Sequence, residues 1–439
     1  MSSPLPSALG RALTPWAACL AAALAGCGLT VAVFWPGFMS YDSVEQLGQA
    51  RAGTVTDWHP PVMAVLWGWL DRVVSGPGGM LLFHNLVFWA GLGLAVHSLL
   101  PRTRAAGLVV LALGALPVVF GLLSTVWKDV GMGAAVLFGA AFVLLARRTG
   151  RPAWLVPAAL AFLYGLAARK NAATALLPLF AWAGVVLVRD RPRPWLRGWA
   201  LGAAALVVAQ GLVMGANHLL VRSPPTFQLQ TILIHDLVGV SLRAREVKLP
   251  PWIMEPQPYT LEDLAKTYTA DNLVAIFCST TARQIPQTKD PAHWAELQRF
   301  WLQTVREHPG AWLAHRAAFF SALLGVDRSC YPFHDGIIGN DLGIEFHPGP
   351  VSRRAMAALH ALENSLLFRP WVWLAALLAL MAAAALLGRQ VGVVVTLGTS
   401  GVLYLLPYFV VGPTCDFRYA WWTVLSALLS AVALAAPRE

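Results

Sequence analysis

The sequence predicts an all-α polytopic membrane protein with about ten transmembrane helices and an external soluble insertion of mixed structure. Hydrophobic residues make up 57% of the 439 residues and charged residues only 12%, about half the charge of a typical soluble chain. The mean hydropathy is +0.60. Apolar runs that approach the roughly 20 residues needed to cross a bilayer as a helix recur along the chain.

Ten apolar segments are predicted to span the membrane. The first begins near residue 13 and is too long for a cleaved signal peptide, so we expect it to be retained. Pro157, Pro178 and Pro407 interrupt some of the later segments. The predicted spans are 13–35, 80–100, 106–123, 130–146, 154–168, 172–188, 197–218, 370–388, 391–411 and 419–436.

The stretch 61–74 is too short to span and carries Asp71 and Arg72. We expect a helix on the membrane surface, with half of a helical hairpin as the alternative. Between the seventh and eighth spans lies a hydrophilic insertion, residues 222–369. It is predicted to hold a helix over 294–324, broken at Pro309-Gly310, and a loop over 325–350 that covers part of the site.

Arginine and lysine residues predict the orientation of the bundle, because cytoplasmic loops carry an excess of them. With a cytoplasmic N-terminus, twelve lie inside and six lie outside, apart from the insertion. The twelve are Arg11, Arg102, Arg104, Arg147, Arg148, Arg151, Arg189, Arg191, Arg193, Arg197, Arg389 and Arg438; the six are Arg51, Arg72, Lys128, Arg169, Lys170 and Arg418. Both termini are therefore predicted to be cytoplasmic. The net charge of +10 is explained by topology, and no nucleic-acid partner is expected.

Four polar clusters fall at the outer ends of the predicted spans, where charges are costly unless they are paired or functional. Acids and bases that converge on one face are typical of a site for an anionic, lipid-linked substrate. The clusters are Asp42, Glu45, Asp57 and His59 after the first span; Trp127-Lys128-Asp129 before the fourth; Arg169-Lys170-Asn171 between the fifth and sixth; and Cys415-Asp416-Phe417-Arg418-Tyr419 before the last.

Each cluster also has a simpler interpretation. Lys128 and Asp129 fit an ordinary helix start, where the helix dipole favours an anion. Arg169 and Lys170 fit interfacial snorkelling, although an outside basic pair opposes the positive-inside bias. Asp416 and Arg418 fit a local ion pair, and His59 fits a turn before two prolines. Asp42 has the weakest structural explanation, and the joint pattern is stronger than any single member.

Metal and disulfide signals are weak. The loop 325–350 contains several aspartates and histidines, but the chain has no HExxH motif and no paired CxxC motif. We expect no metal and no other cofactor. Cys278, Cys330 and Cys415 are predicted to lie outside, where a disulfide persists. A Cys330–Cys415 bridge would tie the insertion to the last hairpin, but three candidates leave the pairing open.

This layout resembles the GT-C superfamily of integral membrane glycosyltransferases, which includes lipid A aminoarabinose transferase and the protein O-mannosyltransferases. In that family an aspartate just beyond the first span lies at the catalytic centre, and Asp42 matches it. A second acidic residue at the fourth span matches Asp129 in Trp127-Lys128-Asp129. The family's surface helices match residues 43–51 and 61–74. The resemblance covers residues 13–190, with weaker support at 400–436.

The resemblance implies sugar transfer from a polyprenyl-phosphate donor to an envelope glycan, glycolipid or protein on the external face of a bacterial inner membrane. Residues 1–221 would be the catalytic module of about seven helices, and residues 370–439 the last three helices. Asp42 and Asp129 are the predicted catalytic residues, since a carboxylate can accept the acceptor hydroxyl proton. Predicted substrate-binding residues are Glu45, His59, Lys128, Arg169, Lys170, Asn171, Asp416, Arg418 and Tyr419.

Two departures from the family and two other functions bear on this interpretation. The acidic pair of the first loop is reduced to Asp42 with Glu45 one turn on, and the large insertion is not C-terminal.

An O-antigen polymerase or ligase would use a diphosphate-linked donor and a loop rich in Arg and His. A lipid-linked sugar transporter or flippase would show repeats and helices broken at the midplane, whereas here the charges gather at one face.

Overall fold

The computed structural model describes residues 14–436, and every regular element in that range is a helix. Four isolated β-bridges occur in the same range, with no strand. The insertion, predicted to be of mixed structure, consists of helices and loops in this range, because its short apolar runs form brief helices. Arg11 and Arg438, which entered the orientation argument, lie outside the described residues.

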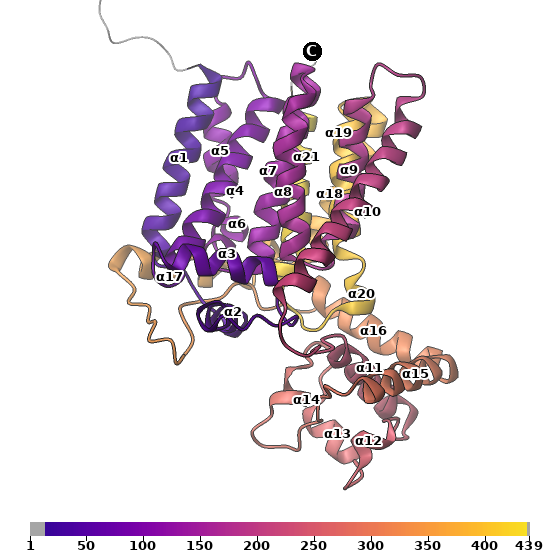
Figure 1. The fold of residues 1–439 in the computed structure, drawn as a ribbon. Helices are drawn as coiled ribbons and strands as arrows, with labels where there is room; N and C mark the ends of the chain where they lie inside the picture. The colour runs from indigo at the N-terminus through magenta and orange to yellow at the C-terminus, as the bar shows by residue number, and fades with distance from the viewer. Residues whose placement is uncertain (1–13, 437–439) are drawn as a thin grey trace, which may run out of the picture.

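An upright bundle of long apolar helices forms the upper part of the molecule (Figure 1). Proline occupies the first turn of four of its helices, where the missing N–H costs nothing. The bundle consists of α1 (Pro15–Phe34), α4 (Gly78–Leu99), α5 (Ala106–Gly114), α6 (Pro117–Phe120), α7 (Lys128–Thr149), α8 (Leu155–Ala168), α9 (Ala172–Leu187), α10 (Pro194–Leu220), α18 (Pro370–Leu387), α19 (Val391–Leu405) and α21 (Trp421–Ala435).

All ten predicted spans are helical, but fewer are long enough to cross a bilayer. Seven of the described helices meet the length and apolarity needed, or eight if α5 and α6, which meet at a bend of 63°, count as one. Helices α8 and α9 have 14 and 16 residues. At 1.5 Å per residue they reach roughly 21–24 Å, short of the roughly 30 Å hydrocarbon core. The chain is an all-α polytopic membrane protein with fewer full-length spans than predicted.

Helix α7 lies at the centre of the bundle, and small residues allow its neighbours to approach closely. A Cβ added at Gly91 of α4 would lie 2.9 Å from the Cα of Phe138 of α7. On the other side, a Cβ at Gly139 would lie 2.4 Å from the ring of Phe162 of α8. Small residues at helix contacts are the usual basis of helix packing in membranes. The hydrophobic effect contributes little to helix association there, because the surrounding lipid is also apolar. This packing holds Lys128 and Asp129 at the lower end of the bundle centre.

Short helices and loops cover the lower end of the bundle (Figure 1). The predicted surface helix is α3 (Pro61–Asp71), which buries Met63 and Trp67 while Trp69 is 62% exposed. It lies beside α2 (Tyr41–Ala52), and α17 (Pro350–Leu362) lies at the same end. The short elements η1 (Leu122–Ser124), η2 (Pro152–Trp154), α20 (Tyr408–Val411) and η4 (Phe417–Ala420) complete the described helices outside the insertion, while α17 and η3 (Leu366–Phe368) belong to the last part of the insertion.

The insertion projects from this lower end and has its own apolar core, which includes Ile234, Leu237, Leu264, Ile276 and Leu297. Its predicted helix over 294–324 is present as two helices that meet at His308, beside the proline that was expected to break it. The helices are α11 (Gln230–Ala244), α12 (Pro251–Met254), α13 (Leu261–Thr267), α14 (Val274–Cys278), α15 (Pro291–Glu307) and α16 (Pro309–Leu324).

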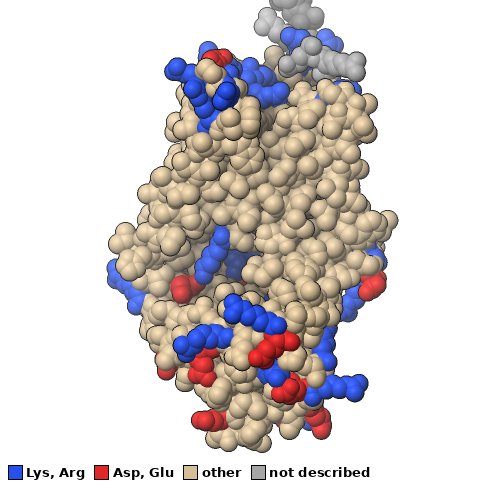
Figure 2. Space-filling view, turned by 90° about the vertical axis from the view of Figure 1, so that its right-hand side faces the viewer, with Lys and Arg blue, Asp and Glu red and all other residues tan. Residues whose placement is uncertain are grey.

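Charge is separated along the bundle axis. Figure 2 shows a broad belt without charged residues on this face, with mainly Lys and Arg above it and charges of both signs below it. A recess that holds basic side chains opens near the lower border of this belt (Figure 2). The lower end is where the four polar clusters meet.

Candidate functional site

Four segments far apart in the chain meet at the lower end of the bundle. They are the first turn of α2, the first turn of α7, the turn between α8 and α9, and the link that leads into η4. Direct contacts join them: Asp42 of α2 contacts Lys128 of α7 and Arg418 of η4, and Asp129 contacts Arg169. The structure thus joins Asp42, Lys128, Asp129, Arg169 and Arg418 in one network, whereas Lys170 contacts only the carbonyl of Asp57 and Gln228 beside it.

Asp42 lies at the centre of the network. Its Oδ2 is 3.5 Å from Lys128 Nζ and 3.3 Å from Arg418 Nη1. Burial opposes ionisation of the carboxyl group, but the charges of Lys128 and Arg418 outweigh it and hold the pKa of Asp42 well below its ordinary value. Its side chain remains 29% exposed, so Asp42 is a carboxylate that a substrate can reach.

Glu45 and His59 extend the network on the α2 side. His59 Nε2 is 3.0 Å from Glu45 Oε2, and its Nδ1 is 3.2 Å from Lys128 Nζ. Because the ammonium of Lys128 can only donate, His59 Nδ1 accepts from it and Nε2–H donates to Glu45. Burial and the nearby Lys128 lower the pKa of His59, which agrees with this neutral tautomer. His59 therefore orients Lys128.

Asp129 has no exposed surface. One of its carboxylate oxygens forms an ion pair with Arg169 and lies 3.5 Å from the hydroxyl of Tyr404. The other lies 3.8 Å from Arg418 Nε. A carboxylate buried in this way is stable only because cations surround it. We expect Asp129 to position the two arginines rather than to touch a substrate.

Arg169 is held from every side. Its Nε donates to Asn171 Oδ1 at 2.9 Å and its Nη2 donates to Tyr408 Oη at 2.6 Å. The guanidinium also lies 4.8 Å from the ring centroid of Tyr419, which stacks on Tyr408. Contacts of this kind leave Arg169 little freedom and favour a fixed cationic surface over interfacial snorkelling.

Arg418 links three aspartates. Besides Asp42 and Asp129, it contacts Asp416 through Nε at 2.8 Å, and its guanidinium lies 4.5 Å from the ring of Trp127. Burial raises the pKa of Asp416 to about 6, although Arg418 opposes the shift. The pKa alone would make Asp416 the better base near neutral pH, but its side chain is only 9% exposed. Accessibility favours Asp42.

The insertion holds the segment that carries Asp416 and Arg418. A disulfide joins Cys415 to Cys330, with a Cα–Cα distance of 5.2 Å, which answers the pairing left open by the sequence. Arg316 of α16 donates to the carbonyl of Gly412 at 3.1 Å, and the amide of Cys415 donates to the carbonyl of Asp271 at 2.7 Å. The insertion is therefore a scaffold for this edge of the site.

A cavity of about 510 Å³ lies between the network and the start of the insertion. Lys170 donates from its rim to the carbonyl of Asp57 at 3.0 Å and to Gln228 Oε1 at 3.3 Å. Among the described residues, Lys170 has no carboxylate within ion-pair distance. The lining includes Asp57, Trp58, Pro60, Lys128, Arg169, Lys170, Asn171, Phe227, Gln228, Leu229, Ile232, Tyr408, Val411, Pro413 and Tyr419. The cavity combines basic and apolar walls.

Several residues that complete the site were not among the predicted site residues. Trp127, named in the sequence only as part of a cluster, stacks on Arg418 and donates to Ser40 Oγ at 2.8 Å, while Tyr408 binds Arg169. Gln228 and Phe227 line the cavity from the insertion. Tyr408 lies at the end of an apolar run and Gln228 in a loop, so neither carries a local signal. The described residues contain no group of three or more His, Cys, Asp or Glu side chains that could hold a metal ion.

No family model matches the chain, and no curated protein matches it. Among solved structures, it is similar to the crystal structure of ArnT from Cupriavidus metallidurans bound to undecaprenyl phosphate. The match covers 94% of this chain and 76% of that chain, at 14% sequence identity and a TM-score of 0.35. A likeness this distant assigns neither a substrate nor the role of any residue.

Proposed function

We propose that the protein is a membrane glycosyltransferase that moves a sugar from a polyprenyl-phosphate donor to an acceptor hydroxyl. The observation that carries the proposal is the cavity between the network and the start of the insertion, where Lys128, Arg169 and Lys170 line one space and Lys128 contacts Asp42. The sequence layout, which resembles GT-C transferases, supports the same reaction. The sugar and the acceptor, whether glycan, glycolipid or protein, are left open.

The cavity walls fit a phosphate attached to an apolar chain. Three cations face the space, and charge-assisted contacts to phosphate are among the stronger hydrogen bonds in proteins. Trp58, Leu229 and Val411 supply apolar surface next to them. Since Lys170 has only neutral partners, its charge is available for an incoming anion. A diphosphate-linked donor, as a polymerase or ligase would use, needs the same charges. Comparing the affinities for a polyprenyl phosphate and a polyprenyl diphosphate distinguishes the two donor types.

Asp42 would act as the general base. Lys128 and Arg418 stabilise its carboxylate, and the low pKa that results makes Asp42 by itself a weak base. The phosphate of a bound sugar donor would add negative charge beside Lys128 and would accept hydrogen bonds from its ammonium group. Both effects would raise the pKa of Asp42. Asp42 would therefore become an effective base only when the sugar donor is bound.

The reaction balances as a single displacement. The acceptor oxygen bonds to the anomeric carbon while its proton passes to Asp42, and the bond from that carbon to the phosphate oxygen breaks. The polyprenyl phosphate leaves with the bonding electrons, and Lys128, Arg169 and Lys170 stabilise its charge. The anomeric configuration inverts. The proposal assigns charge neutralisation to these cations and needs no metal.

We also propose that the site faces the outside of a bacterial inner membrane, with both termini in the cytoplasm. The arginine bias and the Cys330–Cys415 disulfide both support this orientation, since disulfides persist in oxidising compartments. Reporter fusions after Arg151 and Arg193 should report cytoplasm, and one within the insertion after Pro286 should report the outside. A cytoplasmic signal after Pro286 would contradict the orientation.

The function can be tested with the full-length protein in lipid nanodiscs. We expect saturable binding of a polyprenyl phosphate, weaker binding of a polyprenyl diphosphate, and loss of one envelope glycolipid or glycan modification in a deletion strain analysed by mass spectrometry. Tighter binding of the diphosphate would favour the polymerase or ligase type. Translocation of the lipid-linked sugar with no product formed would favour a transporter.

A further inference from the structure

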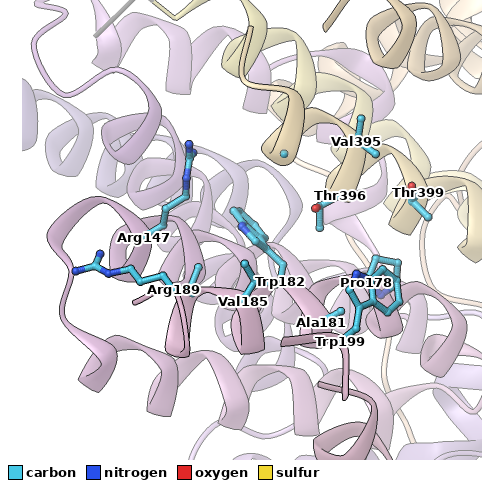
Figure 3. Close-up of a pocket in the computed structure, with 12 residues that line it drawn as sticks. Arg147, Pro178, Ala181, Trp182, Val185, Arg189, Trp199, Val395, Thr396 and Thr399 are labelled. Atoms are coloured by element: carbon cyan, nitrogen blue, oxygen red, sulfur yellow. The ribbon is translucent and has the colours of Figure 1, made fainter. Parts of the chain in front are cut away.

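A second cavity, of about 480 Å³, lies at the opposite end of the bundle and shares no residue with the candidate site. It runs between α9 and α10 on one side and α19 on the other, and the end of α7 closes it. Figure 3 shows the arginines at one end and Pro178 and Thr399 toward the other. The lining is Arg147, Pro178, Ala181, Trp182, Val185, Val186, Arg189, Trp199, Gly392, Val395, Thr396 and Thr399.

Two arginines form the polar end of this cavity. Arg147 lies in the last turn of α7, and the only hydrogen bond of its side chain among the described residues is a 3.3 Å contact from Nη1 to Gln390 Oε1. Arg189 follows the end of α9 and lies 3.5 Å from Asp190, whose side chain is 89% exposed. An exposed pair of this kind contributes little, so most of the positive charge remains available.

The rest of the cavity matches the depth of one leaflet. From Pro178 to Leu187, α9 rises roughly 14 Å at 1.5 Å per residue, close to half of the roughly 30 Å hydrocarbon core. Trp182, Val185 and Val395 make its walls mainly apolar. Deeper in the bundle the helices meet again, where Ser400 Oγ donates to the carbonyl of Ala175 at 2.6 Å. The cavity is thus a slot with a basic mouth and an apolar interior.

We propose that this slot binds an anionic phospholipid of the leaflet at the arginine-rich end. Its phosphate would contact Arg147 and Arg189, and one acyl chain would lie along Trp182 and Val395. Basic pockets between transmembrane helices at a membrane surface have the chemistry that recognises anionic head groups. A free phosphate would not fill the apolar part of the slot, and the ammonium group of a zwitterionic lipid would offset the charge of its own phosphate next to the arginines.

A bound lipid would connect helices that also build the candidate site. Helix α9 begins directly after Asn171, and α19 leads to Tyr404, which contacts Asp129. The lipid would fill the slot between the far ends of these helices. We therefore expect binding to raise the thermal midpoint of the protein, because a ligand of the native state stabilises it by mass action.

The test uses the full-length protein in detergent, with native mass spectrometry and thermal unfolding as readouts. Phosphatidylglycerol should bind and stabilise, whereas phosphatidylcholine with the same chains and inorganic phosphate should do neither. The double variant Arg147→Gln/Arg189→Gln should bind phosphatidylglycerol roughly tenfold or more weakly. Arg148→Gln is the matched control, since Arg148 is the next residue but donates to the carbonyl of His97 at 2.9 Å.

A second variant tests the slot without changing charge. Gly392 lines the cavity and a Cβ there would meet no atom within 4 Å, so Gly392→Leu adds a bulky side chain at the slot without a clash at its Cβ. We expect this variant to lose phosphatidylglycerol binding and to keep its own thermal midpoint without lipid. Three results would overturn the proposal. Phosphatidylcholine could bind as tightly as phosphatidylglycerol, inorganic phosphate could bind as tightly as the lipid, or both variants could bind phosphatidylglycerol as the wild type does. Transfer activity at the other end of the bundle plays no part in these readouts.

Discussion

Lys170→Gln isolates the contribution of one cation to donor binding. Lys170 Nζ contacts only the carbonyl of Asp57 and the amide oxygen of Gln228, and glutamine keeps a polar side chain at the rim of the cavity. The carboxylate of Asp57 is close enough to interact with this charge, but neither Asp42 nor Asp129 pairs with Lys170, so its removal leaves the Asp42 and Asp129 network intact. The change in affinity then reports the interaction with the donor phosphate alone.

The size of the effect follows from the geometry. A charge-assisted hydrogen bond contributes about 1.5–3 kcal/mol, and each 1.4 kcal/mol corresponds to about tenfold in affinity. We expect Lys170→Gln to weaken polyprenyl phosphate binding by roughly ten- to a hundredfold. Lys128→Gln should do more, because it also removes the 3.5 Å partner of Asp42 and the donor to His59.

Equilibrium binding of radiolabelled polyprenyl phosphate to protein in nanodiscs measures this change, and its salt dependence should fall in the variant. Lys266→Gln is the matched control, because Lys266 pairs with Glu262 on α13 and does not line the cavity. Unchanged affinity in Lys170→Gln, or an equal loss in Lys266→Gln, would refute the assignment of the cavity to the donor phosphate.

Three further predictions concern the base, the scaffold and pH. Asp42→Asn should lower transfer by roughly 100-fold or more while donor binding is kept, whereas near-normal turnover would rule Asp42 out as the base. Replacing Cys330 and Cys415 by serine should lower the thermal midpoint, since closure of a loop with a sequence separation of 85 contributes up to about 4.6 kcal/mol in the chain-entropy model; an unchanged midpoint would contradict the scaffold role. Burial and Lys128 lower the pKa of His59, so its neutral form stabilises the fold above the unfolded pKa of about 6.5, and this contribution is lost as pH falls below it. Between pH 7.5 and 5.5 the midpoint should therefore fall further in the wild type than in His59→Gln, and equal falls would contradict the burial of neutral His59.

Much of the fold and the face of the site could be predicted from the sequence, because both depend on local patterns. Apolar runs predicted all ten helical segments, and polar residues at the ends of these runs predicted that the segments around Asp42, Lys128, Arg169 and Arg418 gather at one end. The predicted surface helix and the break near Pro309 were also local, since chain length and proline chemistry decide them.

Only the tertiary structure decided the pairing within the site. Asp129 is buried against Arg169, whereas Asp42 remains accessible. This difference depends on which helices face each other, and the residue pattern within either helix does not specify that arrangement. The same is true of Tyr408, which acquires its role only because α20 lies beside the α8–α9 turn. Helix length is likewise a tertiary result, since α8 and α9 end where their neighbours and polar turns require. Local sequence specifies polarity and secondary structure, whereas proximity between residues hundreds of positions apart arises from packing.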